Sequence, residues 1–334
     1  MGWCCCITWL WSILAIGLGV ALFEFFSRKK RDLKGKHVLV TGGSSGIGLS
    51  VALDVAARGA SVTLVARDVD KLEKAQVEIA TVISRVASGG YVQYFSGDLS
   101  GDPEKIASIV KDAEVDLGPI YMLVNCAGFA RAQTFEDIPP WLVKQLMDVN
   151  YTGSFIITQE AVRSMKRQHE GVVVFTSSQA GLIGLYGFTA YSAAKAALVR
   201  LAEALHMEVK PYNITVTVCY PPDTDTPGFE EENQTKPVET KLMSETAGLL
   251  KPEEVAKKLV DDALIGSFTS TVGLEGFMLT TLCAGMGPIT DAFSFLTQVF
   301  LFGIFRAVSA FYLWSFNKIV DKEYRKRQAC KKSE

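Results

Sequence analysis

Short apolar runs alternate with longer segments of helical periodicity through the middle of the chain. Between the runs lie stretches of helix length, such as Asp68–Val86 and Pro103–Leu117. This alternation is typical of βαβ units, and we expect a doubly wound parallel sheet of about seven strands within residues 35–270. The runs predicted to be strands are His37–Val40, Ser61–Val65, Tyr91–Phe95, Met122–Val124, Val172–Phe175 and Ile214–Val218.

The segment Pro221–Pro237 interrupts this pattern with Pro, Asp, Thr, Glu and Asn. It is too polar for a buried element and long for a plain connection, so we predict a functional flap over a substrate.

The N-terminus carries a long apolar run. Trp3 to Phe23 would span about 31 Å as a helix, roughly the thickness of a bilayer core. We therefore predict a membrane anchor over residues 1–27. A cleaved signal peptide is the alternative, but no basic region precedes the run and no small-residue cleavage site follows it. The basic cluster Arg28–Arg31 follows directly, which predicts that the main domain lies in the cytosol.

Residues 271–317 form a second apolar stretch, predicted to associate with the membrane, and residues 318–334 form a basic cytosolic tail. A helix over Asp291–Phe316 would carry a narrow polar stripe that includes Arg306. At the centre of a spanning helix an arginine costs about 2.5 to 3.5 kcal/mol. A span, a hairpin and a helix lying in the interface therefore remain open.

Charge and cysteine content exclude several classes of protein. The 334 residues carry a net charge of −2, with no basic domain of the kind that binds nucleic acid. The seven cysteines form no CxxC pair and no metal-ligand spacing. We expect no metal and a reducing compartment; a homo-oligomer is compatible with the sequence.

A glycine-rich turn follows the first predicted strand and precedes a helix. Glycines at such a turn permit positive φ and let backbone amides approach a pyrophosphate at a helix N-terminus. The sequence thus indicates a Rossmann-type nucleotide site. The residues of the turn predicted to bind the cofactor are Gly42, Ser44, Ser45, Gly46, Ile47 and Gly48.

Further candidates stand at the ends of the next strands. NAD-selective enzymes carry an acid after the second strand, whereas Arg67 here suits the 2′-phosphate of NADPH, and Lys71 adds a second charge one turn on. Asp98, followed by Leu99, is predicted to accept from the adenine amino group. Asn125 precedes small residues that leave room for the cofactor.

Tyr191 and Lys195 stand four residues apart, on one face of a predicted helix. An ammonium near the phenol would lower the pKa of the tyrosine and make it a better proton carrier at neutral pH. Ser178, thirteen positions before Tyr191, would hydrogen-bond the same carbonyl oxygen. These three residues are the predicted catalytic centre.

Together with the glycine turn and the Asn125–Gly128 strand end, this triad resembles the short-chain dehydrogenase/reductase family over residues 35–270. The resemblance implies hydride transfer from NADPH to a ketone, with Tyr191 as proton donor. It also makes Asn150 the fourth member of the catalytic set, holding a water that links the lysine to solvent. In this family the lysine also contacts the nicotinamide ribose.

Three runs, Ser177–Gly181, Gly187–Tyr191 and Tyr220–Phe229, are similar to the family members that reduce 3-ketodihydrosphingosine to dihydrosphingosine. Pro222 occupies a position where most of the family has glycine. The implied substrate is a long-chain 3-keto amino alcohol taken from the bilayer. Another lipid-type ketone, a steroid or retinoid, is the alternative, and so is an inactive membrane scaffold, against which the intact Ser178, Tyr191 and Lys195 count.

Two further patterns bear on the substrate and the location. The acidic residues of the flap would attract an ammonium head group; they are Asp223, Asp225, Glu230, Glu231 and Glu232. Lys331 and Lys332 are similar to a dilysine retrieval signal, which predicts an endoplasmic reticulum membrane protein facing the cytosol. The sequons at Asn150, Asn213 and Asn233 should then remain unmodified.

Overall fold

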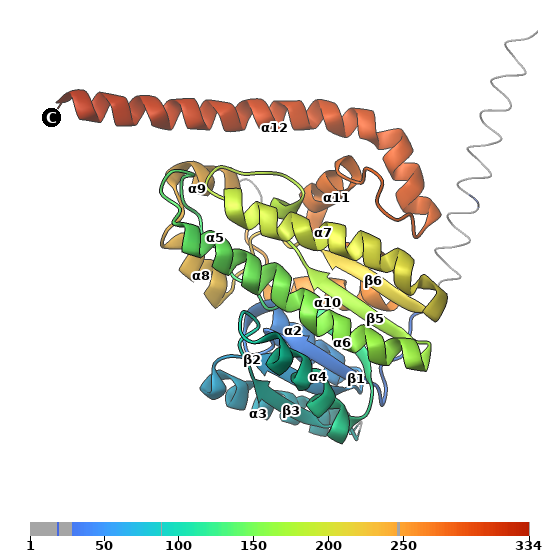
Figure 1. The fold of residues 1–334 in the computed structure, drawn as a ribbon. Helices are drawn as coiled ribbons and strands as arrows, with labels where there is room; N and C mark the ends of the chain where they lie inside the picture. The colour runs from blue at the N-terminus through green and yellow to red at the C-terminus, as the bar shows by residue number, and fades with distance from the viewer. Residues whose placement is uncertain (1–18, 20–28, 88, 246–247, 334) are drawn as a thin grey trace, which may run out of the picture.

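The computed structural model describes residue 19 and residues 29–87, 89–245 and 248–333. A seven-stranded parallel sheet forms the centre, in the order β3-β2-β1-β4-β5-β6-β7 (Figure 1). The predicted parallel α/β fold is confirmed, while the predicted N-terminal membrane helix lies outside the described residues. The strands are β1 (His37–Thr41), β2 (Ser61–Ala66), β3 (Val92–Ser96), β4 (Ile120–Asn125), β5 (Gly171–Thr176), β6 (Ile214–Cys219) and β7 (Thr269–Ser270).

Helices cover both faces of the sheet. One layer contains α2 (Gly46–Ala57), α3 (Val69–Val86) and α10 (Pro252–Leu264), and the other contains α4 (Pro103–Leu117), α6 (Gly153–Gln168) and α7 (Thr189–Val209). Strands buried on both faces are continuously apolar, and β1, β4 and β5 are buried at every position. Two apolar cores result, one on each side of the sheet.

The element boundaries differ from the predicted ones in small ways. Strand β3 begins at Val92, one residue later than predicted, and the side chain of Tyr91 before it is exposed. Asp68 lies just before α3, where its side chain accepts a hydrogen bond from the Lys71 amide. Strand β7 has two residues, paired with Val218 and Cys219, and is too short to leave an apolar pattern.

The flap residues Pro221–Pro237 contain a short helix, α8 (Pro227–Asn233), whose N-terminus is capped by the Thr226 side chain. A second short helix, α9 (Val238–Ser244), follows. The prediction that this segment is too polar to be buried was wrong: Glu232 and Lys236 are both buried, because their opposite charges pair.

The C-terminal region folds as α11 (Gly273–Leu282) and a helix of 42 residues, α12 (Ala292–Ser333). The predicted helix started correctly but ended too early, since α12 continues through the basic tail. Ala292–Cys330 is long and apolar enough to cross a bilayer by length and composition. In Figure 1, however, α12 lies across the catalytic domain, above α7, α9 and α11, and it packs against α9 and α11.

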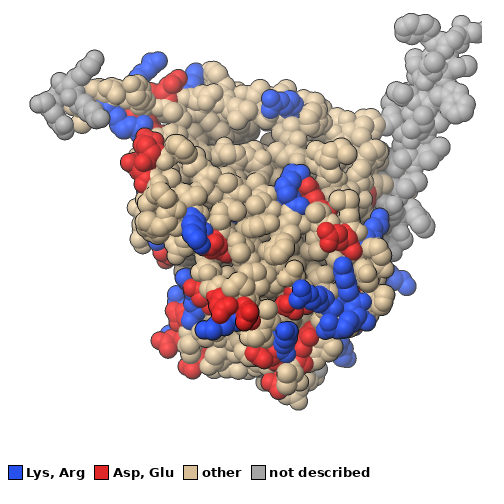
Figure 2. Space-filling view, in the orientation of Figure 1, with Lys and Arg blue, Asp and Glu red and all other residues tan. Residues whose placement is uncertain are grey.

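Charged side chains are unevenly distributed over the face shown in Figure 2. Most lie on the half that contains β1, β2 and β3, while the half beneath α12 is largely uncharged.

Candidate active site

A cavity of about 700 Å³ follows the carboxyl ends of the strands. Its floor is formed by residues that come directly after β1 to β6, from Gly42 to Pro221. It spans the point between β1 and β4 where the strand order reverses, which is where doubly wound sheets bind ligands.

The glycine turn between β1 and α2 has no room for side chains at two positions. Gly42 has φ +65°, and a Cβ there would lie 2.8 Å from the Ala127 nitrogen. A Cβ at Gly48 would lie 2.2 Å from the Gly42 oxygen. Ser45, before α2, is extended and its side chain makes no capping hydrogen bond to the helix. The cradle therefore fits a pyrophosphate at the N-terminus of α2, and all six predicted turn residues line the cavity.

The residues predicted to bind the 2′-phosphate and the adenine also line this cavity. Arg67 is exposed after β2 and lines it, as do Lys71, Asp98 and Leu99. Lys71 lies 3.6 Å from the Asp68 carboxylate, so its charge is partly compensated. Burial favours a raised pKa for Asp98, but hydrogen bonds from Ser100 and the Arg67 charge outweigh it and hold that pKa below its ordinary value.

The position of Asn125 does not fit the prediction that this residue binds the cofactor. Its side chain is buried beneath β4, where Nδ2 donates to Thr158 Oγ1 at 3.0 Å and to the Val174 oxygen at 3.3 Å. Residues Cys126–Gly128 line the cavity, whereas Asn125 does not appear in its lining. We infer that it joins β4 to its neighbours and supports the cavity wall from behind.

The structure brings Ser178, Tyr191 and Lys195 together. The Ser178 hydroxyl is close enough to the Tyr191 phenol to oppose the rise of the phenol pKa. Lys195 Nζ lies 5.7 Å from the centroid of the Tyr191 ring and donates to the Thr176 oxygen at 2.9 Å. The neighbouring Ser177 hydroxyl donates to the Lys195 backbone oxygen at 3.0 Å, which joins β5 to α7. All three predicted residues line the cavity.

Asn150 lies behind this group, in a wide helical turn (Asp148–Thr152) that joins α5 (Pro140–Met147) to α6. Turns of this kind are frequent at functional sites. Its amide is fully buried: Nδ2 donates to the Phe129 and Leu146 oxygens, each at 3.0 Å. A Cβ on Gly128 would lie 2.5 Å from Asn150 Oδ1 and 3.1 Å from Lys195 Nζ, so this glycine lets the two side chains meet across it.

Burial controls the titration of the central pair. It raises the pKa of the Tyr191 phenol, with Glu232 and Asp223 adding to the rise and the Ser178 hydroxyl opposing it. Burial also lowers the pKa of Lys195 to about 8. The lowered tyrosine pKa predicted from the sequence was wrong, because desolvation outweighs a lysine at this distance. The neutral phenol is nevertheless the form that can donate a proton.

The opposite wall of the cavity comes from the C-terminal helices, a contribution that sequence reasoning missed. Two polar residues of this wall, Arg306 and Ser309, belong to the predicted polar stripe. The residues of α12 that line the cavity recur at intervals of three and four, and this spacing could have identified the face. The apolar members of the wall are Met278, Leu279, Leu282, Phe302, Phe305, Tyr312, Leu313 and Phe316.

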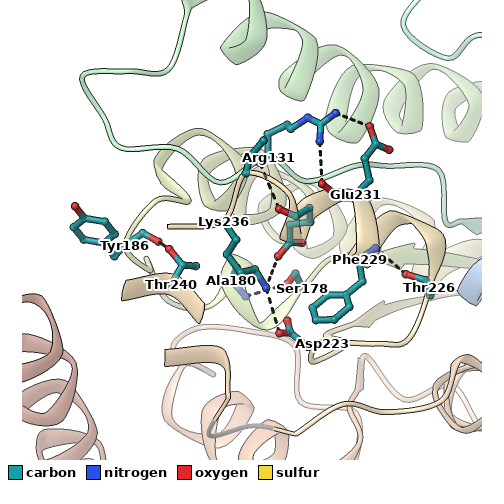
Figure 3. A network of polar contacts seen from close by, with 12 residues as sticks. Arg131, Ser178, Ala180, Tyr186, Asp223, Thr226, Phe229, Glu231, Lys236 and Thr240 are labelled. Carbon is teal, nitrogen blue, oxygen red and sulfur yellow. Dashed lines mark hydrogen bonds and ion pairs between the residues drawn. The ribbon is translucent and has the colours of Figure 1, made fainter. Parts of the chain in front are cut away.

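Among the five acidic residues of the flap, only Asp223 and Glu232 line the cavity. Asp225 and Glu230 are exposed, and Glu231 pairs with Arg131 (Figure 3). The prediction that all five face the substrate was therefore too broad.

The family model described as short chain dehydrogenase matches residues 36–237. This chain belongs to the short-chain dehydrogenase family. Membership makes it an oxidoreductase with a nicotinamide cofactor, in agreement with the glycine cradle. A short-chain type dehydrogenase/reductase from Mycobacterium marinum superposes with a TM-score of 0.64 at 29% identity, covering 73% of this chain and 96% of that one.

Curated relatives match nearly the whole of this chain, including residues that follow the short chain dehydrogenase match. A 3-dehydrosphinganine reductase of Danio rerio is 49% identical over 305 residues, 91% of each chain. A 3-ketodihydrosphingosine reductase of Bos taurus is 50% identical over 294 residues, 88% of each chain.

Proposed function

We propose that this protein reduces 3-ketodihydrosphingosine (3-dehydrosphinganine) to dihydrosphingosine with NADPH, as a step of sphingolipid synthesis. The observation that carries the proposal is the continuity of the cavity. It runs from Ser178 and Tyr191 to the apolar wall of α11 and α12, so a ketone at the tyrosine can extend an alkyl chain along that wall. The names of the relatives support the same substrate.

The chain supplies the proton transfer of the reaction. A reduced nicotinamide, when bound, would supply the hydride for the ketone carbon. Tyr191 donates its phenolic proton to the ketone oxygen, and Ser178, which lies close to the phenol, holds that oxygen in place. Lys195 in its charged form stabilises the phenolate that remains. Asn150, opposite Lys195 across Gly128, holds a water that links the lysine to solvent.

The preference for NADPH rests on Arg67. Its exposed guanidinium lies at the end of β2, where a 2′-phosphate is expected. This position holds an arginine, whereas NAD-selective enzymes carry an acid there. A charge-assisted hydrogen bond to phosphate is about twice as strong as a neutral one.

We place the protein on the cytosolic face of the endoplasmic reticulum membrane. Helix α12 supports this, since its outer side carries exposed apolar residues opposite the cavity wall; they are Phe293, Phe300, Ile304, Phe311 and Trp314. Helix α12 contacts the catalytic domain through its cavity-lining residues and through Arg327. We therefore favour a helix that lies in the membrane interface over one that spans the bilayer. Asn213 is exposed and Asn150 fully buried, so an unmodified Asn213 is the informative check on the cytosolic side.

The deciding experiment is a product assay. Purified full-length protein in detergent or liposomes, supplied with NADPH, should convert 3-ketodihydrosphingosine to dihydrosphingosine. No conversion, together with rapid reduction of a steroid ketone or retinal, would overturn the assignment.

A further inference from the structure

Three charged side chains of the flap meet beside the catalytic centre. Lys236 Nζ lies 2.7 Å from Glu232 Oε1 and 3.4 Å from Asp223 Oδ2. The Lys236 side chain is 1% exposed, and its ammonium also lies 4.6 Å from the centroid of the Phe229 ring. Figure 3 shows this ammonium beside Asp223 and Phe229, with Ser178 close by.

The two carboxylates line the catalytic cavity and the lysine does not. Lys236 instead lines a second, neighbouring hollow, which Asp223 and Phe229 also border. The cavity therefore exposes the carboxylates of the cluster, whereas the ammonium lies outside its lining. Both carboxylates lie close enough to Tyr191 to raise the pKa of its phenol.

The charges of this cluster do not balance. Two carboxylates share the Lys236 ammonium, which leaves a formal excess of one negative charge. The Glu232 residue is 9% exposed, and its Oε1 pairs with Lys236. A buried carboxylate that shares its cation with a second carboxylate is costly, and a second cation would relieve it.

The orientation of Glu232 is built into α8. Its neighbour Glu231 does not line the cavity: Arg131 Nη1 donates to the Glu231 backbone oxygen at 3.2 Å, and the two side chains pair (Figure 3). Successive residues on a helix point about 100° apart, so this anchor turns Glu232 toward the cavity.

We propose that Glu232, with Asp223 beside it and Lys236 positioning both, recognises the ammonium group of the substrate next to the reacting ketone. The inference rests on the proposed function, because a 3-keto amino alcohol carries its amine on the carbon adjacent to the ketone. A carbonyl oxygen held at Tyr191 thus brings the amine to the two carboxylates. Glu232 is then a specificity residue that selects amino ketones over neutral lipid ketones.

The test compares two substrates and two matched variants. The substrates are 3-ketodihydrosphingosine and the 1-hydroxy-3-ketone of the same chain length without the amino group. Glu232→Gln removes the charge at nearly constant shape, and Glu230→Gln removes the same charge from an exposed position of α8 outside the cavity. Loss of a charge-assisted hydrogen bond should raise KM for the amino ketone about 10- to 100-fold in Glu232→Gln.

The same variant should change KM for the neutral ketone by less than about threefold, and kcat for that ketone should be nearly constant, since the proton donor is intact. Glu230→Gln should behave as wild type on both. If Glu232→Gln folds poorly in a thermal melt, Asp223→Asn provides the same comparison. Equal changes on both ketones, or no change on either, would overturn the assignment of Glu232. Failure of the wild-type protein to reduce either ketone would instead overturn the proposed function.

Discussion

Arg327 of α12 forms an ion pair with Glu239 of α9, with 2.5 Å between Nη1 and Oε1. The Glu239 side chain is 1% exposed and that of Arg327 is 50% exposed. The next residue, Thr240, donates its hydroxyl to the Tyr186 oxygen at 2.8 Å, which ties α9 to the loop before α7 (Figure 3). The long C-terminal helix is thereby fastened to the segment that follows the flap.

Arg327→Gln should loosen this attachment, because a buried carboxylate then loses its charged partner. We expect faster proteolysis within α12 than in the wild type. We also expect KM to rise more for a long-chain ketone than for a short-chain one, since α12 forms the apolar wall. Limited proteolysis and kinetics on two chain lengths measure these effects. Arg325→Gln, at an exposed position of the same helix, is the control; equal behaviour of the two variants would rule the ion pair out.

Arg67→Asp should reverse the nucleotide preference. The substitution removes a phosphate partner and introduces repulsion, so NADPH affinity should fall at least about 100-fold more than NADH affinity. Equilibrium fluorescence titrations with both nucleotides measure the change. Lys74→Asp, one turn beyond Lys71 and outside the cavity lining, should affect neither. Equal losses for both nucleotides would remove Arg67 from the account of specificity.

Tyr191→Phe should lower kcat about 10²- to 10⁴-fold, the usual contribution of a positioned proton donor. NADPH binding should be nearly intact, because only the phenolic oxygen is lost. Changes at Lys195 should impair both turnover and binding. Tyr94→Phe, which removes an exposed hydroxyl that donates to Glu73, is the matched control. Substantial turnover by purified Tyr191→Phe would refute the mechanism.

The pKa of Lys195 near 8 predicts a pH dependence. Lysine is charged below its pKa, so the ammonium that stabilises the phenolate is lost as the pH rises through about 8, while the raised pKa of Tyr191 keeps the phenol protonated. We expect kcat/KM for the nucleotide, which reports the free enzyme, to fall above pH 8. Lys195→Arg, which remains charged, should flatten this fall at a lower overall rate. A constant wild-type value from pH 7 to pH 9 would contradict the prediction.

The outer face of α12 should be protected by lipid. In the variant Phe311→Cys, on that face, the new thiol should react more slowly with a water-soluble thiol reagent in liposomes than in detergent. Val115→Cys, exposed on α4 in the catalytic domain, should react equally fast in both. Site-specific mass spectrometry separates these positions from the native cysteines. Identical rates for Phe311→Cys in liposomes and in detergent would contradict the prediction that lipid covers the outer face of α12.

Features that depend on neighbours in the chain could be predicted from the sequence alone. The glycine turn after β1 is one, since φ at Gly42 and the close approach of Gly48 to Gly42 are constraints within a few residues. The shared face of Tyr191 and Lys195 is another, because a helix of any sequence brings positions four apart together. Strands β1, β4 and β5 were recognisable because burial on both faces requires continuous apolar runs, whereas β7 was too short to leave one.

Features that depend on the surroundings of a side chain were decided by the tertiary structure. The pattern could not show that Asn125 turns inward to Thr158 and Val174, or that Glu232 rather than Asp225 faces the cavity. The direction of the Tyr191 pKa shift was predicted wrongly for the same reason. Desolvation and charge pairing depend on every element packed around a group, and the flap, α7 and the C-terminal helices come together only in the folded chain.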